Sequence, residues 1–472
     1  MITLTAPGTV DFDFISMMPA DAVCGIFRPD LANKLKEIKP GFLRFPGGCI
    51  IEGNNLDNRY QWKKSIGPKE TRTFNWNRWA VHNTREEDGY VGPFSHYGQT
   101  LGVGYFEYFL LCEYIGAKPL PVMNVGLACQ YQSTQQVPMD TPEFQEFIQD
   151  ALDLIEFANG GTDTKWGAIR AEMGHPEPFD MDYIGIGNEQ WQTEEVDFFG
   201  RYERFEKAIH EVYPEMRLIG SAGPDVITDR YTRAWEWIHA RVEDNPNFVY
   251  AVDEHYYVAP KWLYENVHFY DNYPRTAKVF AGEYAAHIPG RAGKFNCPEA
   301  NSFEAALAEA AFLTGVERNA DVVVMASYAP LIARLGSTQW SPDLIWFDDK
   351  GCYGTPSYYV QKLYCQYMGN NSLETEASGD KLYASATYCD KCCKYVIKVV
   401  NASDQPAEVQ VELNADSPVV LNGDYKCLQM TAGMDEENSV DEPEKVSPKE
   451  IVLSFENGKV TVPGHSFHVI II

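Results

Sequence analysis

Short apolar runs alternate with stretches of helical periodicity through the first three quarters of the chain. Each run has the length of one strand and ends in polar or glycine residues, which is typical of strands that alternate with helices. Eight such runs lie at residues 10–18, 41–47, 118–126, 181–189, 217–223, 249–257, 277–284 and 321–328. Eight parallel strands suffice to close a (β/α)8 TIM barrel, so the pattern predicts an α/β fold of this class over residues 1–362. The first residues are expected to pack either there or on the following domain.

The pattern changes at about residue 365. Short segments of alternating polarity, separated by Asn, Asp, Gly and Pro turns, replace the helical period. This is typical of an antiparallel β-sandwich, which we expect over residues 363–472. The acidic run at 434–445 is interpreted as a solvated loop within it.

Composition narrows the function. The chain has 472 residues, 45% of them apolar, with 39 Lys and Arg against 67 Asp and Glu, for a net charge of −28. Such a charge repels phosphate backbones and anionic lipid, so neither nucleic acid nor a membrane is an expected partner. A neutral carbohydrate carries no such penalty. The first residues lack a secretory signal, which predicts a cytoplasmic protein unless an upstream signal was removed, in which case it is periplasmic or secreted.

Two glutamates follow apolar runs at positions where barrel enzymes carry catalytic groups. Glu189 ends the fourth run, directly after Asn188, and Glu283 ends the seventh. The sixth run places His255 and Tyr256 between them. Cleavage of a glycosidic bond requires one protonated and one ionised carboxyl group across that bond. The pair therefore predicts a glycoside hydrolase, whereas a single such glutamate could equally be a buried structural carboxylate.

Several segments together are similar to one family, the retaining α-L-arabinofuranosidases of glycoside hydrolase family 51. The similar segments lie at 42–53, 116–126, 183–191, 253–257, 279–287 and 340–361. The resemblance implies that Glu189 is the acid/base and Glu283 the nucleophile. It also implies a set of residues at or just behind the sugar pocket, namely Arg44, Cys49, Asn124, Asn188 and Tyr256. We further assign His255, Trp191 and Gln339 to substrate binding, and we expect neither a metal nor a cofactor.

Other interpretations of these residues stay open. Arg44 is either an ordinary salt-bridged barrel residue or the group that keeps the nucleophile ionised. His255 either contacts the sugar or supports Tyr256 and Glu283. Gln190 and Trp191 depart from the small residues that usually follow Asn-Glu in this family, which points to a different leaving-group side. Tryptophans expected near the mouth, each with core packing as the alternative, are Trp62, Trp76, Trp79, Trp191 and Trp340.

Two further segments raise questions of their own. Residues 54–100 form a long insertion that we expect to shape substrate access. The cluster of Cys389, Cys392 and Cys393 matches only half of a zinc site, so free thiols or one local disulfide are favoured over a structural metal.

The predicted function is exo-acting removal of α-L-arabinofuranosyl groups from arabinoxylan, arabinan or their oligosaccharides by double displacement. An endo-acting β-1,4-glucanase or xylanase on the same scaffold is the first alternative, because two carboxylates do not specify the sugar. A non-catalytic carbohydrate-binding protein is the second. Whether the chain forms a homo-oligomer is left open.

Overall fold

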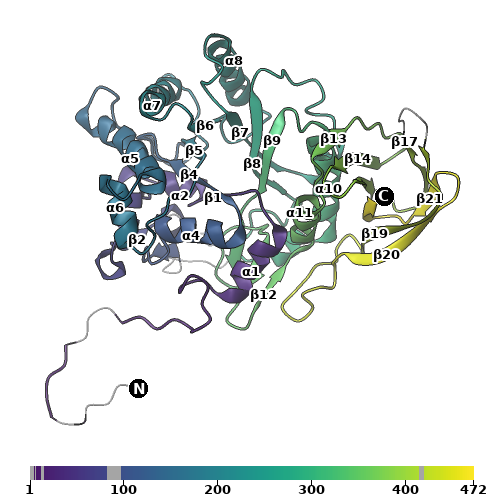
Figure 1. Ribbon diagram of the computed structural model, residues 1–472, viewed down its shortest axis with the longest axis horizontal. Coiled ribbons are helices and arrows are strands. Elements are labelled where there is room, and N and C mark those ends of the chain that lie inside the picture. Colours follow the sequence, from purple (N-terminus) through teal and green to yellow (C-terminus); the bar gives the residue numbers. More distant parts are fainter. Residues whose placement is uncertain (1–4, 6, 12–14, 82–96, 414–418) are drawn as a thin grey trace.

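A parallel sheet forms the centre of the first domain (Figure 1). The computed structural model describes residues 5, 7–11, 15–81, 97–413 and 419–472. Within them the sheet has seven strands, which pair in the order β1 (Phe42–Phe45), β4 (Lys118–Met123), β5 (Tyr183–Ile186), β6 (Arg217–Ser221), β7 (Ala251–Val258), β8 (Lys278–Ala286) and β9 (Val323–Tyr328). Every pair is parallel. The predicted α/β barrel class is therefore confirmed.

Helices cover the outside of this sheet (Figure 1). They are α1 (Pro29–Ile38), α4 (Tyr105–Ile115), α5 (Pro142–Asn159), α6 (Lys165–Glu172), α7 (Phe198–Val212), α8 (Asp229–Asp244), α9 (Pro260–Glu265), α10 (Phe303–Arg318) and α11 (Pro356–Gln366). Helix α5 begins at Pro142, because the Thr141 hydroxyl accepts the Phe144 amide and proline suits the first helical position. Helix α10 is buried along most of its length. It contacts strands of both domains.

The prediction of a first strand at residues 10–18 is wrong. Those of its residues that the structure describes form no strand, and Val10, Ile15, Met17 and Met18 are exposed. Alternating apolar residues form a strand only where a neighbouring strand supplies hydrogen bonds and a surface to cover. Here the run has neither among the described residues. Strands β1 and β9 are consequently the outer strands of the sheet and do not pair with each other.

Short elements join the barrel strands. They are the helices α2 (Gly48–Glu52) and α3 (Arg78–Val81), the paired strands β2 (Asn75–Trp76) and β3 (Gly98–Gln99), and the small sheet β10 (Ile332–Arg334), β11 (Ile345–Phe347) and β12 (Cys352–Gly354). The insertion at 54–100 contains α3, β2 and β3, but residues 82–96 lie outside the described residues. Among the described residues, no helix combines the length and the apolar character that crossing a bilayer requires.

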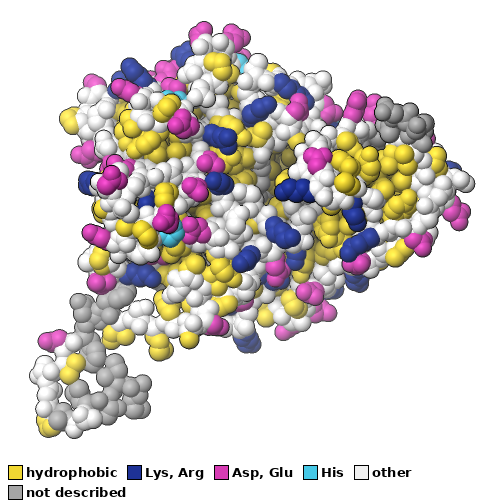
Figure 2. Space-filling view, viewed as in Figure 1, with side chains coloured by type: hydrophobic (Ala, Val, Ile, Leu, Met, Phe, Trp, Pro, Cys, Tyr) yellow, Lys and Arg dark blue, Asp and Glu magenta, His cyan; other side chains and the backbone are white. Residues whose placement is uncertain are grey.

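The C-terminal region is built from antiparallel strands, as predicted. Its main sheet pairs β13 (Asn371–Leu373), β14 (Leu382–Cys389), β15 (Lys394–Asn401), β22 (Ser466–Ile471), β19 (Gly423–Thr431) and β20 (Lys449–Phe455). Two shorter pairs accompany it, β16 (Ala407–Gln410) with β21 (Lys459–Val462) and β17 (Glu412–Leu413) with β18 (Val419–Val420). Figure 2 shows acidic and basic side chains interspersed over one face of the molecule, so on this face the negative charge is not gathered into one patch.

The acidic run 434–445 is more than a solvated loop. The carbonyl oxygens of Glu436 and Met434 accept the backbone amides of Phe303 and Glu304, at the start of α10. Asn438 is buried and donates to the carbonyl of Gly354. The first amides of a helix have no partner within that helix, so a loop that supplies acceptors is held in place despite its charge.

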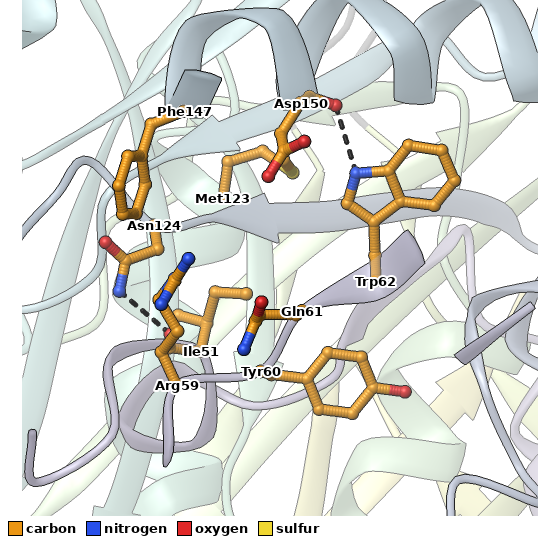
Figure 3. Close-up of a pocket in the computed structure, with 9 residues that line it drawn as sticks. All are labelled: Ile51, Arg59, Tyr60, Gln61, Trp62, Met123, Asn124, Phe147 and Asp150. Carbon is orange, nitrogen blue, oxygen red and sulfur yellow. Dashed lines mark hydrogen bonds between the residues drawn. The ribbon is translucent and has the colours of Figure 1, made fainter. Parts of the chain in front are cut away.

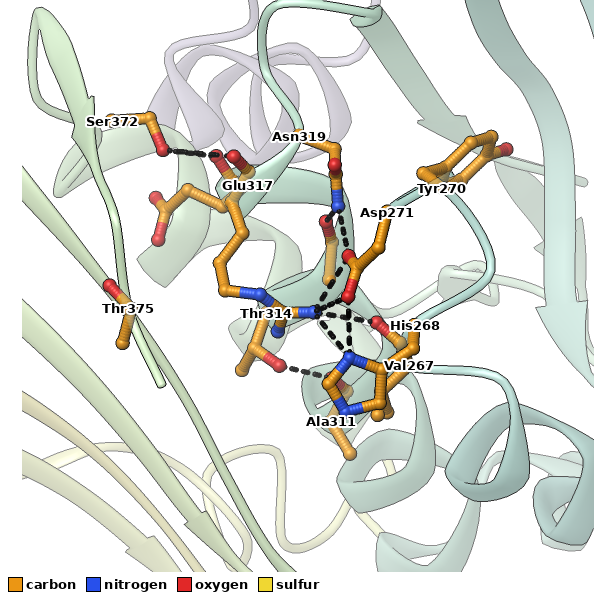
Figure 4. Close-up of polar contacts among 12 residues, drawn as sticks. Val267, His268, Tyr270, Asp271, Ala311, Thr314, Glu317, Asn319, Ser372 and Thr375 are labelled. Carbon is orange, nitrogen blue, oxygen red and sulfur yellow. Dashed lines mark hydrogen bonds and ion pairs between the residues drawn. The ribbon is translucent and has the colours of Figure 1, made fainter. Parts of the chain in front are cut away.

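A buried ion pair joins α10 to the C-terminal sheet. Lys398 on β15 lies 2.5 Å from Glu317, and its side chain is 0% exposed. The hydroxyl of Ser385 donates to the other oxygen of Glu317, and Ser372 donates to its backbone carbonyl (Figure 4). The domain division at residue 362 stays a prediction. Because α11 runs to Gln366 and its Tyr364 stacks on Phe467, we propose that the linker follows this helix.

The same C-terminal end of α10 is also fastened to the barrel (Figure 4). The carboxylate of Asp271, in the segment before β8, accepts from Asn319 at 2.7 Å and from Arg318 at 3.1 Å. His268 lies 2.6 Å from the same carboxylate. One helix is therefore held by polar contacts on both its barrel side and its sheet side.

The Glu317–Lys398 pair gives a stability prediction. Lys398→Ala leaves the Glu317 charge buried without a counter-charge, so we expect a loss of about 3–5 kcal/mol in the free energy of unfolding. Urea denaturation followed by circular dichroism measures it. Lys398→Met combined with Glu317→Gln removes both charges and should recover most of the loss. An unfolding midpoint for Lys398→Ala equal to that of the wild type would contradict the assignment.

Candidate active site

Glu189 and Glu283 face each other at the carboxyl ends of the strands. Glu189 follows β5 and Glu283 lies on β8. Nδ1 of His255 lies between them, 2.8 Å from Oε1 of Glu189 and 3.7 Å from Oε2 of Glu283. One carboxylate oxygen of each glutamate and this nitrogen lie within 4.8 Å of one another. Carboxyl groups about 5 Å apart suit a direct attack on a sugar, whereas groups about 6.5–9.5 Å apart leave room for a water.

Charged and hydroxyl donors surround Glu283. Nη1 of Arg44 donates to its Oε1 at 2.7 Å, and the hydroxyl of Tyr257 donates to its Oε2 at 2.7 Å. Burial alone would raise the pKa of Glu283, but the charges of His255 and Arg44, together with these hydrogen bonds, lower it below its usual value. Glu283 is therefore the ionised member of the pair.

Arg44 connects four strand ends. From β1, its Nη2 donates to Asn188 after β5 at 2.7 Å and to Asp253 on β7 at 3.2 Å, while Nη1 reaches Glu283 on β8. Burial acts to lower the pKa of Arg44, but the charges of Asp253 and Glu283 raise it well above the usual value. The guanidinium thus stays charged beside the Glu283 carboxylate.

A buried carboxyl group, Glu52, fixes the segment that carries Glu189. Asn188 donates through Nδ2 to Glu52 at 3.3 Å, and Gln190 donates through Nε2 to its other oxygen at 2.5 Å. Gln190 also accepts the backbone amide of Asn188. Gly48 is required here, since a Cβ at that position would lie 2.0 Å from the Asn188 side-chain oxygen. Gln190 is therefore an internal brace and not part of the leaving-group side.

Cys49 lies beside one oxygen of Glu189. Its Sγ is 3.9 Å from Oε2 of Glu189, at the start of α2. Oε1 of the same carboxyl group is taken by His255. The two oxygens of Glu189 thus have different neighbours, a ring nitrogen on one side and a thiol on the other.

Tyr256 is a correction, because it lies on the opposite face of β7. Its ring packs among Trp262, Phe269 and Phe312, and its hydroxyl donates to the buried Glu254. Successive side chains of a strand point to opposite faces, so His255 and its second neighbour Tyr257 point inward while Tyr256 points outward. Tyr257 is therefore the tyrosine of this strand that contacts Glu283.

Asn124 and Gln339 make backbone contacts instead of joining the carboxylate pair. Asn124 donates to the carbonyls of Ile51 and Leu127 at 3.0 Å, and its oxygen accepts the amide of Gly126. It borders a small cavity of about 10 Å³. Figure 3 shows it with Arg59, Tyr60 and Phe147, which also line that cavity. Gln339 is buried and donates to the carbonyl of Trp79. Both residues hold loops that border the site.

Of the five predicted tryptophans, Trp62 is a core residue. Its ring lies against Tyr105, Phe157 and Trp166, and its indole donates to the carbonyl of Asp150 (Figure 3). Trp76 is exposed and contacts Phe74.

The remaining three tryptophans lie near the carboxylates. Trp340 contacts Tyr257, whose hydroxyl binds Glu283, and Trp79 contacts Trp340 in turn. On the side of Glu189, Trp191 contacts the exposed Tyr131 at 5.3 Å between ring centroids. Trp340 therefore packs on the tyrosine that binds Glu283, and Trp191 lies two residues after Glu189 in the sequence.

Three residues of the site were not singled out from the sequence, namely Asp253, Tyr257 and Glu52. The alternation of the segment DEHYY carried a signal for the first two, because Asp253, His255 and Tyr257 share one face. Gly282 makes room for Asp253, since a Cβ there would lie 1.8 Å from its carboxylate. Glu52 gave no comparable signal, because a glutamate in a short helix is ordinarily exposed.

Two groups of metal-ligating side chains occur among the described residues. They are Glu189 with His255 and Glu283, and Cys49 with Glu52 and Cys129. Positive charge adjoins each of them, from Arg44 in the first and Arg78 in the second, which opposes a cation. In the C-terminal hairpin, Cys389 and Cys392 form a local disulfide, one of the two alternatives that were favoured over zinc.

The fold and the site together define a class of protein. A barrel with two facing carboxyl groups at this separation, one of them ionised by an arginine, is the arrangement of the retaining glycoside hydrolases.

Comparisons with known proteins identify the family. The Alpha-L-arabinofuranosidase 1 domain matches residues 34–275, and the Alpha-L-arabinofuranosidase C-terminal domain matches residues 282–466. The chain belongs to the α-L-arabinofuranosidases of glycoside hydrolase family 51.

Individual relatives cover the chain more fully than the chain covers them. An extracellular exo-α-L-arabinofuranosidase of Streptomyces chartreusis is 38% identical over 80% of this chain and 43% of its own length. α-L-Arabinofuranosidase 1 of Arabidopsis thaliana is 36% identical over 99% of this chain and 63% of its own length. A solved structure of an arabinose-bound family 51 α-L-arabinofuranosidase is 27% identical, with a TM-score of 0.75 over 94% of this chain and 66% of that chain. The chain thus spans about half of the length of these curated relatives.

Proposed function

We propose that the chain hydrolyses terminal α-L-arabinofuranosyl groups of arabinoxylan, arabinan and their oligosaccharides, with retention of configuration. One observation carries the reaction type. An oxygen of Glu189 and an oxygen of Glu283 lie within 4.8 Å of each other, and a ring nitrogen of His255 lies within the same distance of both. The identity of the sugar is supported by family membership and by the arabinose bound to the solved relative. The endo-acting alternative and the binding-protein alternative lack such support.

The first step follows from the neighbours of each carboxyl group. Glu283, ionised beside Arg44 and Tyr257, attacks the anomeric carbon. His255 occupies Oε1 of Glu189, which leaves Oε2, on the Cys49 side, to carry the proton to the leaving oxygen. In the second step Glu189 takes a proton from water, which releases the sugar from Glu283.

The supporting residues act on these two groups. Arg44 and Asn188 hold the ends of β1 and β5 at a fixed separation, and we propose that both also meet sugar hydroxyls when substrate is bound. Cys49 is proposed to contact the sugar beside Glu189. Tyr257 positions Glu283 from the β7 side.

A screen of aryl glycosides tests the function itself. Release of 4-nitrophenol from the α-L-arabinofuranoside, with arabinose as the product from arabinan and arabinoxylan, is the expected result. Preference for an aryl β-cellobioside or xylobioside, with oligosaccharide products, would support the endo-acting alternative. Absence of turnover on every substrate would support the binding protein.

The two glutamates should respond differently to substitution. Glu283→Ala should abolish turnover on every substrate, because no glycosyl-enzyme can form. Glu189→Ala should lose about 10²–10⁴-fold on oligosaccharides but much less on a dinitrophenyl arabinofuranoside, whose leaving group needs no proton. The measurement is kcat/KM of each variant on both substrates. Equal losses on the two substrates in Glu189→Ala would show that Glu189 is not the acid.

Tyr257 gives a prediction about pH dependence. Its hydroxyl is one of the donors that lower the pKa of Glu283, so Tyr257→Phe should raise that pKa. Since Glu283 must be ionised to attack, the acidic limb of kcat/KM should move to higher pH, by about one unit. Tyr256→Phe is the matched control, because its hydroxyl lies on the other face of β7. Identical acidic limbs in both variants would contradict the assignment.

Trp191 is proposed to bind the leaving-group sugar. The side chain of Gln130 accepts the backbone amide of Trp191 and donates to its carbonyl. The guanidinium of Arg230 lies 4.0 Å from the centre of the Trp191 ring. Such a fixed ring near Glu189 provides a surface for a sugar face.

Trp191→Ala should therefore lower kcat/KM about tenfold on arabino-oligosaccharides and much less on a small aryl arabinofuranoside. Trp76→Ala, which removes an exposed tryptophan packed on Phe74, is the control. A loss of the same size on both substrates would place Trp191 outside the leaving-group side.

A further inference from the structure

We propose that Cys49 and Cys129 form an oxidation-sensitive dithiol in the wall of the active site. Peroxide converts this dithiol into a disulfide, which prevents Glu189 from acting as the acid and base. The consequence for activity rests on the proposed function, whereas the disulfide itself does not. Both cysteines are free thiols in the structure.

The two sulfur atoms are already close. The ligand atoms of Cys49, Glu52 and Cys129 all lie within 4.8 Å of one another, and the two thiols share a hydrogen bond. One residue, Gly53, ties the two backbones together, because its amide donates to the carbonyl of Cys49 and its carbonyl accepts the amide of Cys129. Side-chain rotations can therefore close the remaining gap while the backbone stays in place.

Positive charge favours a thiolate at this pair. Two nitrogens of the buried Arg78 guanidinium have no hydrogen-bond partner, and its charge acts on both thiols. The hydrogen bond from Cys49, against the effect of burial and helped by Arg78, lowers the pKa of Cys129 to about 6. The same hydrogen bond, together with burial, raises the pKa of Cys49 well above its usual value. The pair thus holds one thiol and one thiolate at neutral pH, the state that reacts with peroxides.

A metal site is the less favoured use of the same residues. Both oxygens of Glu52 already accept amide hydrogens, from Asn188 and Gln190. Burial raises the pKa of Glu52 well above its usual value, so this carboxyl group is protonated rather than available as an anionic ligand. With Arg78 adjacent, the arrangement suits an anion better than a cation.

The oxidation balances with hydrogen peroxide as the oxidant. The thiolate attacks one peroxide oxygen, the O–O bond breaks, and the other oxygen leaves as hydroxide, which takes the proton of the remaining thiol and becomes water. The second sulfur, now a thiolate, attacks the sulfenic acid so formed, which makes the S–S bond and expels hydroxide. One proton from solvent converts that hydroxide into a second water. In total, two thiols and one peroxide give one disulfide and two waters, and a dithiol reductant reverses the change.

The disulfide alters the surroundings of Glu189. The sulfur of Cys49 lies 3.9 Å from Oε2 of Glu189, the oxygen proposed to carry the catalytic proton, and the disulfide draws that sulfur toward Cys129. The crosslink also joins α2 to the segment that leads from Cys129 to Tyr131, which packs on Trp191. Oxidation therefore acts on the acid/base and on the leaving-group side together.

The test uses the full chain, treated with hydrogen peroxide and then alkylated, digested and analysed by mass spectrometry. We expect a Cys49–Cys129 crosslink that forms in step with a loss of at least about tenfold in kcat/KM on oligosaccharides, restored by dithiothreitol. Cys129→Ser should keep its activity in peroxide, and Cys129→Ala serves if the serine variant does not fold. Cys24→Ser, which removes an exposed cysteine elsewhere, should remain as sensitive as the wild type.

Several results would overturn the proposal. They are oxidation without a Cys49–Cys129 crosslink, peroxide sensitivity retained in the Cys129 variants, and zinc bound by the wild type but lost in those variants. The crosslink is detected without any substrate, so a protein that forms it but cleaves no arabinofuranoside would refute the proposed function and leave the dithiol intact.

Discussion

One guanidinium, that of Arg44, holds the site together. It contacts Glu283 and Asp253 and the amide of Asn188, and through them it links β1 to the ends of β5, β7 and β8. Several carboxyl groups are buried within a few ångströms of one another here, and without a fixed positive charge they could not stay ionised in such surroundings. The contact with Arg44 that stabilises these buried carboxylates also keeps Glu283, rather than Glu189, as the ionised carboxyl group of the facing pair. Stability and reactivity therefore depend on one interaction.

The fold could be predicted largely because its signals are local. Strands ending in polar residues identified seven barrel strands, and the loss of helical period located the C-terminal sheet. The strand predicted at residues 10–18 was wrong, because apolar residues form a strand only beside a partner strand, and the sequence of this segment does not show whether one is present. The loop 434–445 was misjudged for a related reason, since its backbone carbonyls and not its acidic side chains hold it to α10.

The site shows a similar division. Glu189, Glu283 and Arg44 could be singled out from the sequence because each stands at the end of an apolar run, where a barrel places its functional groups. The choice between Tyr256 and Tyr257 depends on which face of β7 points inward, and that is settled by the register against β8. Asn124 and Gln339 carry polar groups suited to a sugar, but the backbone carbonyls nearest to them in space use those groups instead. Part of this competition is local, because Asn124 bonds to Gly126 and Leu127. The bonds from Asn124 to Ile51 and from Gln339 to Trp79 join distant segments and leave no trace in the sequence.

The central claim is that Glu283 attacks the sugar while Glu189 acts as the acid and then the base. The most direct test is to mix Glu189→Ala with a dinitrophenyl α-L-arabinofuranoside and to analyse the protein by mass spectrometry. Formation of the intermediate needs no acid, but its hydrolysis lacks the base, so the account predicts a covalent pentosyl adduct on Glu283. A burst of dinitrophenol without an adduct on Glu283, or with the sugar on another residue, would contradict it.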